Sequence, residues 1–213
     1  MEQNAVDGGN RRYILVQLPE PLDPGNRDQK TASDFCDTLG ISRTIADLTK
    51  ERLRRAAKKI EDENTLFKGD RGFRVFRLDT SNIQTWDPDP SDLEKTLLDS
   101  QKHLKPGRTE QDILYELLLK LGLDLAVPME DRTIAGKTVH SIGAGTLMVC
   151  LAQEITGGDV ESLAQGIVDW HKELAPSGDS QLVFRDSAFA DDVAKTNLAA
   201  ILQQHGLSNV RSL

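Results

Sequence analysis

The stretch LDLAVPMEDRTIAGKTVHSIGAGTLMVCLAQ, residues 123–153, decides the fold of the C-terminal half of the chain. It alternates short runs of β-forming residues with two tight links, IAGKT and GAG. Glycine-containing links of this length between such runs are typical of β-hairpins. The pattern therefore predicts a meander of antiparallel strands.

The residues after this meander predict an alternation of helices and strands. Residues 158–174 carry apolar side chains at helical spacing, and residues 188–206 carry a second helical pattern that ends at Gly206. Each pattern is followed by a short β-rich run, SQLVFRD at 180–186 and LSNVRSL at 207–213. We therefore expect a mixed α/β module with the order β-hairpin, helix, strand, helix, strand.

The N-terminal third has a different pattern, which predicts strand, helix, strand. RRYILVQL (11–18) and GFRVFRLD (72–79) are short apolar runs that favour β structure. Between them, residues 41–63 place an apolar stripe at helical spacing, with Ser42 or Thr44 as the N-cap. This order usually forms a parallel, right-handed βαβ unit, so we expect a piece of a parallel sheet here.

The two regions are joined by a segment that predicts a connector and two helices. SNIQTWDPDPSD (81–92) is rich in proline and aspartate, which indicates a loop. Residues 91–103 predict a modest helix, and Thr109 begins a stronger one. Asp112 lies three residues after this threonine, so the pair predicts a capping box at the start of the helix.

Charge is distributed unevenly along the chain. The net charge is −8, of which residues 1–70 hold −1 and residues 71–213 hold −7, so contact with DNA phosphates is expected from the first third. Cations gather on the predicted helix at 41–63. Two interpretations stay open, a solvated face whose aliphatic stems pack on the core, or a helix that contacts phosphates. The candidate DNA-binding residues are Lys50, Arg52, Arg54, Arg55, Lys58 and Lys59.

Glycine spacing does not indicate a nucleotide loop. SIGAGTLM (141–148) has Gly143 and Gly145, but Met148 stands where a dinucleotide fingerprint requires its third glycine. The residues that follow predict a strand and not the start of a helix. A hairpin turn is therefore expected at this position.

Metal ligands and disulfides are not indicated either. The four histidines are scattered and lack nearby cysteines, which argues against a zinc site. Asp87, Asp89 and Asp92 lack the glycine and the distal glutamate of a calcium loop. Cys36 and Cys150 are expected to be free thiols of a cytoplasmic protein, and no apolar run is long enough to cross a membrane.

Five blocks of sequence, taken together and in order, resemble one family. The resemblance is to the C-terminal part of the Mod subunits of type III restriction-modification enzymes, which transfer a methyl group from S-adenosylmethionine to adenine in DNA. The blocks cover nearly the whole chain. They are MEQNAVDGGNRRYILVQLPEPL, LTKERLRRAAKKI, GFRVFRLDTSNIQTW, DILYELLLKLGLDL and FRDSAFADDVAKTNLAAILQQHG.

The resemblance implies that the catalytic part of the enzyme is not in this sequence. In the family, the cofactor-binding glycine loop precedes a helix that ends like MEQN here, and a catalytic Asp-Pro-Pro-Tyr motif lies further upstream. This chain has no Pro-Pro dipeptide. Met1 is therefore expected to be an internal methionine of a longer enzyme. No catalytic residue is expected here, and no S-adenosylmethionine is expected to bind to this piece alone.

The resemblance also implies two peripheral cofactor residues. Gln17 matches the strand-end position that often holds the cofactor ribose, and Asp79 matches a polar position near the cofactor adenine. The alternative for both is the ordinary polarity of a strand end.

We thus expect an α/β chain with three parts. Residues 1–80 would be the trailing part of a Rossmann-like methyltransferase sheet, residues 81–122 a helical connector, and residues 123–213 a C-terminal module. The expected partners are DNA, a second methylase subunit and the restriction subunit. The alternative is a free-standing protein-interaction module without enzymatic ancestry.

Overall fold

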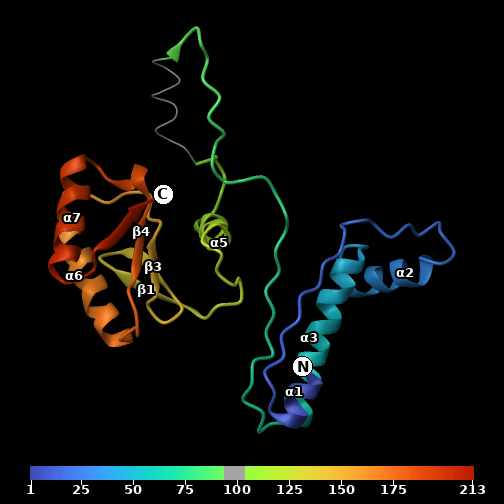
Figure 1. Ribbon diagram of the computed structural model, residues 1–213. Coiled ribbons are helices and arrows are strands. Elements are labelled where there is room, and N and C mark those ends of the chain that lie inside the picture. Colours follow the sequence, from blue (N-terminus) through green and yellow to red (C-terminus); the bar gives the residue numbers. More distant parts are fainter. Residues whose placement is uncertain (94–103) are drawn as a thin grey trace. The chain divides into compact units, whose positions relative to one another are not determined.

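The computed structural model describes residues 1–93 and 104–213, which fall into two compact units. Unit 1 is Met1–Phe76 and unit 2 is Arg77–Leu213. The described residues contain six α-helices and one five-stranded mixed sheet, which confirms the α/β class (Figure 1). The helix predicted at 91–103 lies outside the described residues except for its first three positions.

The sheet of unit 2 follows the predicted meander and then changes to parallel pairing. Its strands lie in the order β1-β2-β3-β4-β5, with antiparallel pairing from β1 to β3 and parallel pairing from β3 to β5. The hairpin, helix, strand, helix, strand order is therefore confirmed. The strands are β1 (Met129–Ile134), β2 (Lys137–Ile142), β3 (Leu147–Cys150), β4 (Gln181–Phe184) and β5 (Asn209–Ser212).

The two predicted links are hairpin turns. Ala135 and Gly136 join β1 to β2 with φ values of 49° and 74°, the left-handed backbone that a two-residue hairpin turn requires. Gly143 and Gly145 join β2 to β3 and also have positive φ. The GAG sequence is thus a hairpin turn, as predicted, and does not lead into a helix.

Helices cover both faces of this sheet (Figure 1). α6 (Gly157–Leu174) and α7 (Asp192–Gln204) lie on one face, and α5 (Glu110–Lys120) lies on the other. Each face has its own buried apolar core. The first includes Val139, Met148, Leu163, Trp170 and Leu198, and the second includes Leu114, Leu118, Ile142, Val149 and Leu151.

Side chains cap the helices of unit 2 where the sequence indicated. The Thr109 hydroxyl accepts a hydrogen bond from the Asp112 N–H at 3.2 Å, and the Asp112 carboxylate accepts one from the Thr109 N–H at 2.9 Å. The bonds that the Asp112 carboxylate accepts from the N–H and the hydroxyl of Thr109 lower the pKa of Asp112. Thr156 and Asp159 repeat the arrangement at the start of α6. The predicted capping box is confirmed, and each box satisfies backbone donors that a helix leaves unpaired.

Unit 1 is organised around one long helix. It contains α1 (Glu2–Asp7), α2 (Lys30–Leu39) and α3 (Ile45–Glu63), and the Thr44 hydroxyl caps α3 by accepting from the Asp47 N–H at 3.0 Å. The predicted helix and one of its two candidate caps are thus confirmed. None of the helices in the described ranges combines the length and apolar composition needed to cross a membrane.

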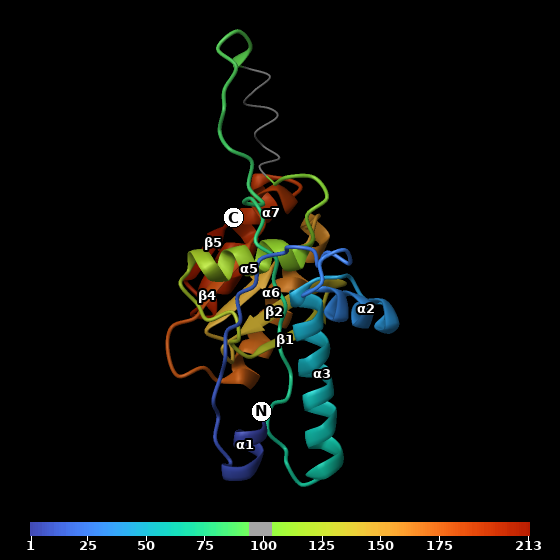
Figure 2. The same cartoon turned by 90° about the vertical axis from the view of Figure 1, so that its right-hand side faces the viewer.

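The strands predicted at 11–18 and 72–79 are wrong for this structure. Both segments are extended but form no β-ladder with any described residue, and most of their side chains are exposed. Figures 1 and 2 show residues 10–20 and 72–76 of unit 1 running in one direction and α3 running in the other, which is the chain path of a βαβ unit. The extended path is present, but neither segment is hydrogen-bonded into a β-ladder within the described ranges, and a strand requires such pairing.

A close contact between α6 and β1 gives a test of the helix-on-sheet packing. A Cβ atom at Gly166 would lie 2.3 Å from Cγ2 of Ile134, and the χ1 angle of a β-branched residue resists rotation. We expect Gly166→Ala to lower the free energy of unfolding by about 1–3 kcal/mol in chemical denaturation.

The control is Gly178→Ala, because a Cβ there meets nothing within 4 Å. In an Ile134→Ala background the cost of Gly166→Ala should fall towards zero. An equal cost in both backgrounds would show that this contact does not set the distance between helix and sheet.

Candidate functional site

The six candidate DNA-binding cations lie on one helix and on one side of it. At about 100° per residue, Lys50, Arg52, Arg54, Arg55, Lys58 and Lys59 occupy an arc opposite Leu53 and Ile60. We call these six residues the basic arc. All of them except Lys50 are exposed. The structure therefore brings the predicted residues together on a single surface, while their role in DNA binding stays a prediction.

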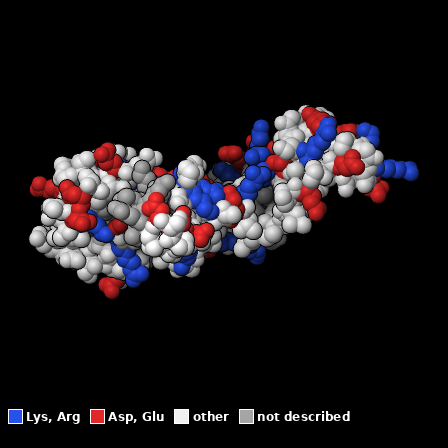
Figure 3. Space-filling model, turned by 90° about the horizontal axis from the view of Figure 1, so that it is seen from above, with Lys and Arg blue, Asp and Glu red and all other residues white. Residues whose placement is uncertain are grey.

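Acidic residues of the same helix neutralise part of the basic arc. Glu51 accepts from Arg55 at 2.8 Å and lies 3.7 Å from Arg54, and Asp47 pairs with Lys50. The hydrogen bond from Arg55 lowers the pKa of Glu51, and the one from Lys50 lowers the pKa of Asp47. Figure 3 shows basic and acidic groups side by side on the visible face of unit 1. Ion pairs at a solvent-accessible helix surface contribute little to stability, so phosphates can compete for Arg54 and Arg55, which are exposed.

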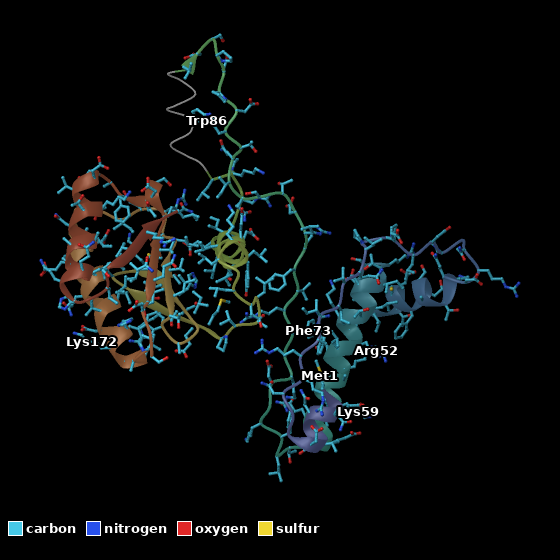
Figure 4. All side chains as sticks on the ribbon, viewed as in Figure 1. Met1, Arg52, Lys59, Phe73, Trp86 and Lys172 are labelled. Carbon is cyan, nitrogen blue, oxygen red and sulfur yellow. The ribbon has the colours of Figure 1, made fainter. Side chains whose placement is uncertain are left out.

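The other cations of the basic arc have weaker local partners. Within the described ranges Arg52 and Lys58 form no salt bridge, and Lys59 lies 3.6 Å from Glu2 and 3.9 Å from Glu63. Figure 4 shows Arg52 and Lys59 on the side of α3 away from Phe73. These three side chains are the ones most readily available to an anionic ligand.

A groove follows one flank of α3, beside Arg54 and Lys58 of the basic arc. It has a volume of about 480 Å³ and lies between the helix and residues 71–73. Arg71, which sequence reasoning missed, lies 3.4 Å from Glu61 in this groove, and Phe73 is half-buried beside it. The lining residues are Arg54, Ala57, Lys58, Glu61, Asp62, Arg71, Gly72 and Phe73.

The two candidate cofactor residues fall in different units and are described separately. Gln17 of unit 1 is exposed, and its side-chain amide donates to the carbonyl oxygen of Leu18 at 3.3 Å. Asp79 of unit 2 accepts from Arg108 at 2.7 Å. This hydrogen bond, with one from the Thr80 N–H, lowers the pKa of Asp79 to about 2. Their roles in holding a cofactor stay predictions.

A polar network around Glu116 of α5 holds the connector, and sequence reasoning missed it. The Glu116 carboxylate accepts from the Ser81 hydroxyl at 2.5 Å and from the Asn82 N–H at 2.6 Å. The buried Asn82 side chain donates to the carbonyl oxygen of Asp112 at 2.9 Å. The hydrogen bond from Arg108 to Asp79 holds the residues that precede Ser81 in the same way. Asp79 therefore already has a structural role, independent of any cofactor.

Neither a metal-binding cluster nor a disulfide is found among the described residues. Across residues 1–93 and 104–213, no group of three or more His, Cys, Asp or Glu side chains is arranged to hold a metal ion. Cys36 and Cys150 are both buried and free, and burial raises the pKa of Cys150.

Comparison with known proteins gives one distant relative. No family model matches the chain. The Mod subunit of the type III restriction-modification enzyme EcoP15I of Escherichia coli is 30% identical to it over 178 residues. This chain is a distant relative of a type III Mod subunit. The match covers 84% of this chain and 24% of the relative, so the chain spans about a quarter of the length of that Mod subunit.

The Glu116 network gives a prediction for pH. Burial raises the pKa of Glu116, but hydrogen bonds from Ser81, Asn82 and Lys120 outweigh it and bring the folded value to about 2, below the ordinary 4.5. A depressed pKa contributes stability that is present above about pH 4.5 and is lost as the pH falls towards 2. We expect Glu116→Gln to cost about 2 kcal/mol at pH 7 and to flatten the pH dependence between 4.5 and 2.

Urea unfolding at a series of pH values measures both effects. The matched control is Glu161→Gln on the exposed face of α6, which should change neither. Parallel curves for the wild type and Glu116→Gln would mean that the network contributes nothing to the pH dependence.

Proposed function

We propose that this chain is the C-terminal part of an S-adenosylmethionine-dependent, adenine-specific DNA methyltransferase of a type III restriction-modification system. The observation that supports this best is the match over 84% of the chain to the EcoP15I Mod subunit. The extended segments of unit 1 also support it, because their path is that of a βαβ unit of a Rossmann-like sheet (Figure 2).

In this proposal the parts of the chain have separate roles. Residues 1–80 form the trailing part of the methyltransferase sheet, residues 81–122 form a helical connector, and residues 123–213 form an association module. The two-sided core and the acidic balance of the last part suit contacts with protein better than contacts with DNA. It would serve association with a second Mod subunit or with the restriction subunit.

The basic arc would contact DNA in the complete enzyme. Lysine and arginine side chains on an exposed helix face position a protein on the phosphate backbone without reading sequence. Arg52, Lys58 and Lys59 support this role, because the acids of α3 neutralise them least. The DNA contact of this chain would therefore add affinity and salt dependence, and the choice of methylation site would be made elsewhere.

The cofactor and the catalytic step would belong to the complete enzyme. Methyl transfer requires the adenine amine to be held in line with the methyl donor, and the target base to be flipped into a pocket. Gln17 and Asp79 are at most peripheral to such a site. We therefore expect S-adenosylmethionine to bind to the complete enzyme and not to this chain alone.

A second candidate, a free-standing interaction module, is favoured by one observation. Unit 2 has a five-stranded sheet with a buried apolar core on both faces. The DNA upstream of the Met1 codon separates the two candidates. A continuing reading frame with a glycine loop and an Asp-Pro-Pro-Tyr motif supports the methyltransferase, and a ribosome-binding site directly before Met1 supports the free-standing module.

Charge reversal tests the DNA contact. The protein is a chimera in which this chain replaces the matching segment of the EcoP15I Mod subunit. We expect Arg52→Glu, Lys58→Glu and Lys59→Glu together to weaken duplex DNA binding and to reduce the slope of log K against log salt by about 2–3, since each phosphate contact contributes about 0.9.

The matched control reverses the exposed cations Arg27 and Lys68, which lie outside α3. It should leave both quantities nearly unchanged. The DNA role of the basic arc is excluded if the α3 variant keeps the affinity and the salt slope of the parent chimera.

A further inference from the structure

One edge of the unit 2 sheet lacks the side chains that usually prevent further pairing. Natural edge strands are often protected by charged residues, and β1 follows this rule with Glu130, Asp131 and Arg132 in succession. β5, at the other edge, has Arg211 as its only charged residue. Its one neighbour among the described residues is β4, so its outer side is open to another strand.

The backbone groups on this open side follow from the pairing of β5 with β4. Leu213, directly after β5, donates its N–H to the carbonyl oxygen of Phe184 at 2.8 Å, and its own carbonyl oxygen accepts from the Asp186 N–H at 3.0 Å. Because alternate residues of a parallel strand bond to the same neighbour, Val210 and Ser212 direct their N–H and C=O groups away from β4. Each of these residues offers a donor and an acceptor to a further strand.

A small pocket lies beside this edge, between β5 and α7. It has a volume of about 120 Å³ and is lined mainly by apolar side chains. Lys195 at the pocket is paired with Asp186, so its charge is already neutralised. An aliphatic side chain therefore fits this pocket better than a charged one. The lining residues are Phe184, Phe189, Lys195, Leu198, Ala199, Val210, Arg211 and Ser212.

A strand added at this edge would place its side chains at the pocket. Val210 packs against the apolar core under α6 and α7, so the pocket lies on that face of the sheet. Side chains directly opposite each other on adjacent strands share a face, and every second residue of the added strand would point to the pocket side. Peptides that bind by strand addition gain affinity from main-chain hydrogen bonds and specificity from such pockets.

We propose that the open side of β5 and this pocket, together called the edge site, bind an extended segment of a partner protein by strand addition. The segment carries an aliphatic side chain in the pocket and, on the opposite face, an acidic side chain beside Arg211. The inference rests on the association role proposed above for residues 123–213, and it adds the surface that makes the contact and the chemistry of the partner.

Charge on β5 specifies the partner and makes a second copy a poorer occupant. Arg211 alternates with Val210 along the strand and is exposed, and its Nε donates to the side-chain oxygen of Asn209 at 3.3 Å. An acidic side chain on the added strand would be stabilised beside it. β5 of a second copy brings another arginine in place of that carboxylate. Residues 71–213 also hold a net charge of −7, so two copies repel each other.

Selection of a random octapeptide display library on the 213-residue chain tests the inference. We expect the enriched peptides to share aliphatic residues at alternate positions with an acidic residue between them. When an enriched peptide is synthesised and bound, amide hydrogen exchange of Val210 and Ser212 should slow, because these N–H groups gain partners. Exchange of Arg211 should stay unchanged, because its N–H already faces β4.

Two variants with matched controls separate the edge site from other surfaces. Ser212→Pro removes an outward N–H and no bond to β4, and edge strands tolerate proline at such a position. It should weaken binding of the synthetic peptide at least about tenfold, whereas Ser212→Ala keeps the N–H and should not. Ala199→Trp fills the pocket and should weaken binding to a similar extent, whereas Ala200→Trp on the exposed side of α7 should not. The variants alter different elements, so either pair decides the question if the other variant does not fold.

Three results would overturn the inference. They are an absence of enriched peptides, enriched peptides whose binding neither variant weakens, and a dimer of the chain in sedimentation equilibrium that Ser212→Pro dissociates. The last result would make a second copy the occupant. The selection does not depend on what precedes the Met1 codon. Upstream DNA without the glycine loop and the Asp-Pro-Pro-Tyr motif would therefore contradict the methyltransferase assignment alone.

Discussion

A stable strand of apolar residues has two requirements. Its backbone N–H and C=O groups must be hydrogen-bonded to a neighbouring strand, and its side chains must be covered by another layer of the structure. In unit 2 the inner strands β2, β3 and β4 meet both requirements, because they are paired on both sides and helices pack on both faces, whereas the edge strands β1 and β5 stay largely exposed (Figure 1). In unit 1 the extended segments meet neither among the described residues. The difference between the two units follows from this single constraint.

The elements that the sequence predicted correctly depend on local interactions. The hairpin turns need left-handed backbone at Ala135, Gly136 and Gly143, and the capping box needs only Thr109 and Asp112 within one turn of helix. These signals lie within a few residues of each other. The order of the elements in residues 123–213 could be predicted because consecutive strands are also neighbours in the sheet.

The features that the sequence did not predict depend on distant partners. Residues 11–18 have the composition of a strand, but composition does not say whether a pairing partner is present. The Glu116 network joins residues 34 and 35 positions apart, and the Asp79–Arg108 pair spans 29 positions. The part of the candidate site that lies on α3 was predicted, because the residues of the basic arc are close together in the sequence. Arg71 of the adjacent groove was not predicted.

Charged and apolar side chains lie on different sides of α3. Asp47 and Glu51 partly neutralise the basic arc. The opposite side of the helix carries Leu53, which is half-buried, and Ile60, which is buried. Residues 71–73 lie beside Arg54 and Lys58, so one flank of the basic arc is lined by an extended segment of the same unit.

An experimental structure of the chimera in which this chain replaces the matching segment of the EcoP15I Mod subunit tests the central claim most directly. The account predicts that residues 13–18 lie inside a sheet, hydrogen-bonded to a strand from outside these 213 residues, with Ile14 and Val16 buried. Residues 13–18 left in solvent, or paired only with the same segment of a second copy, would contradict it.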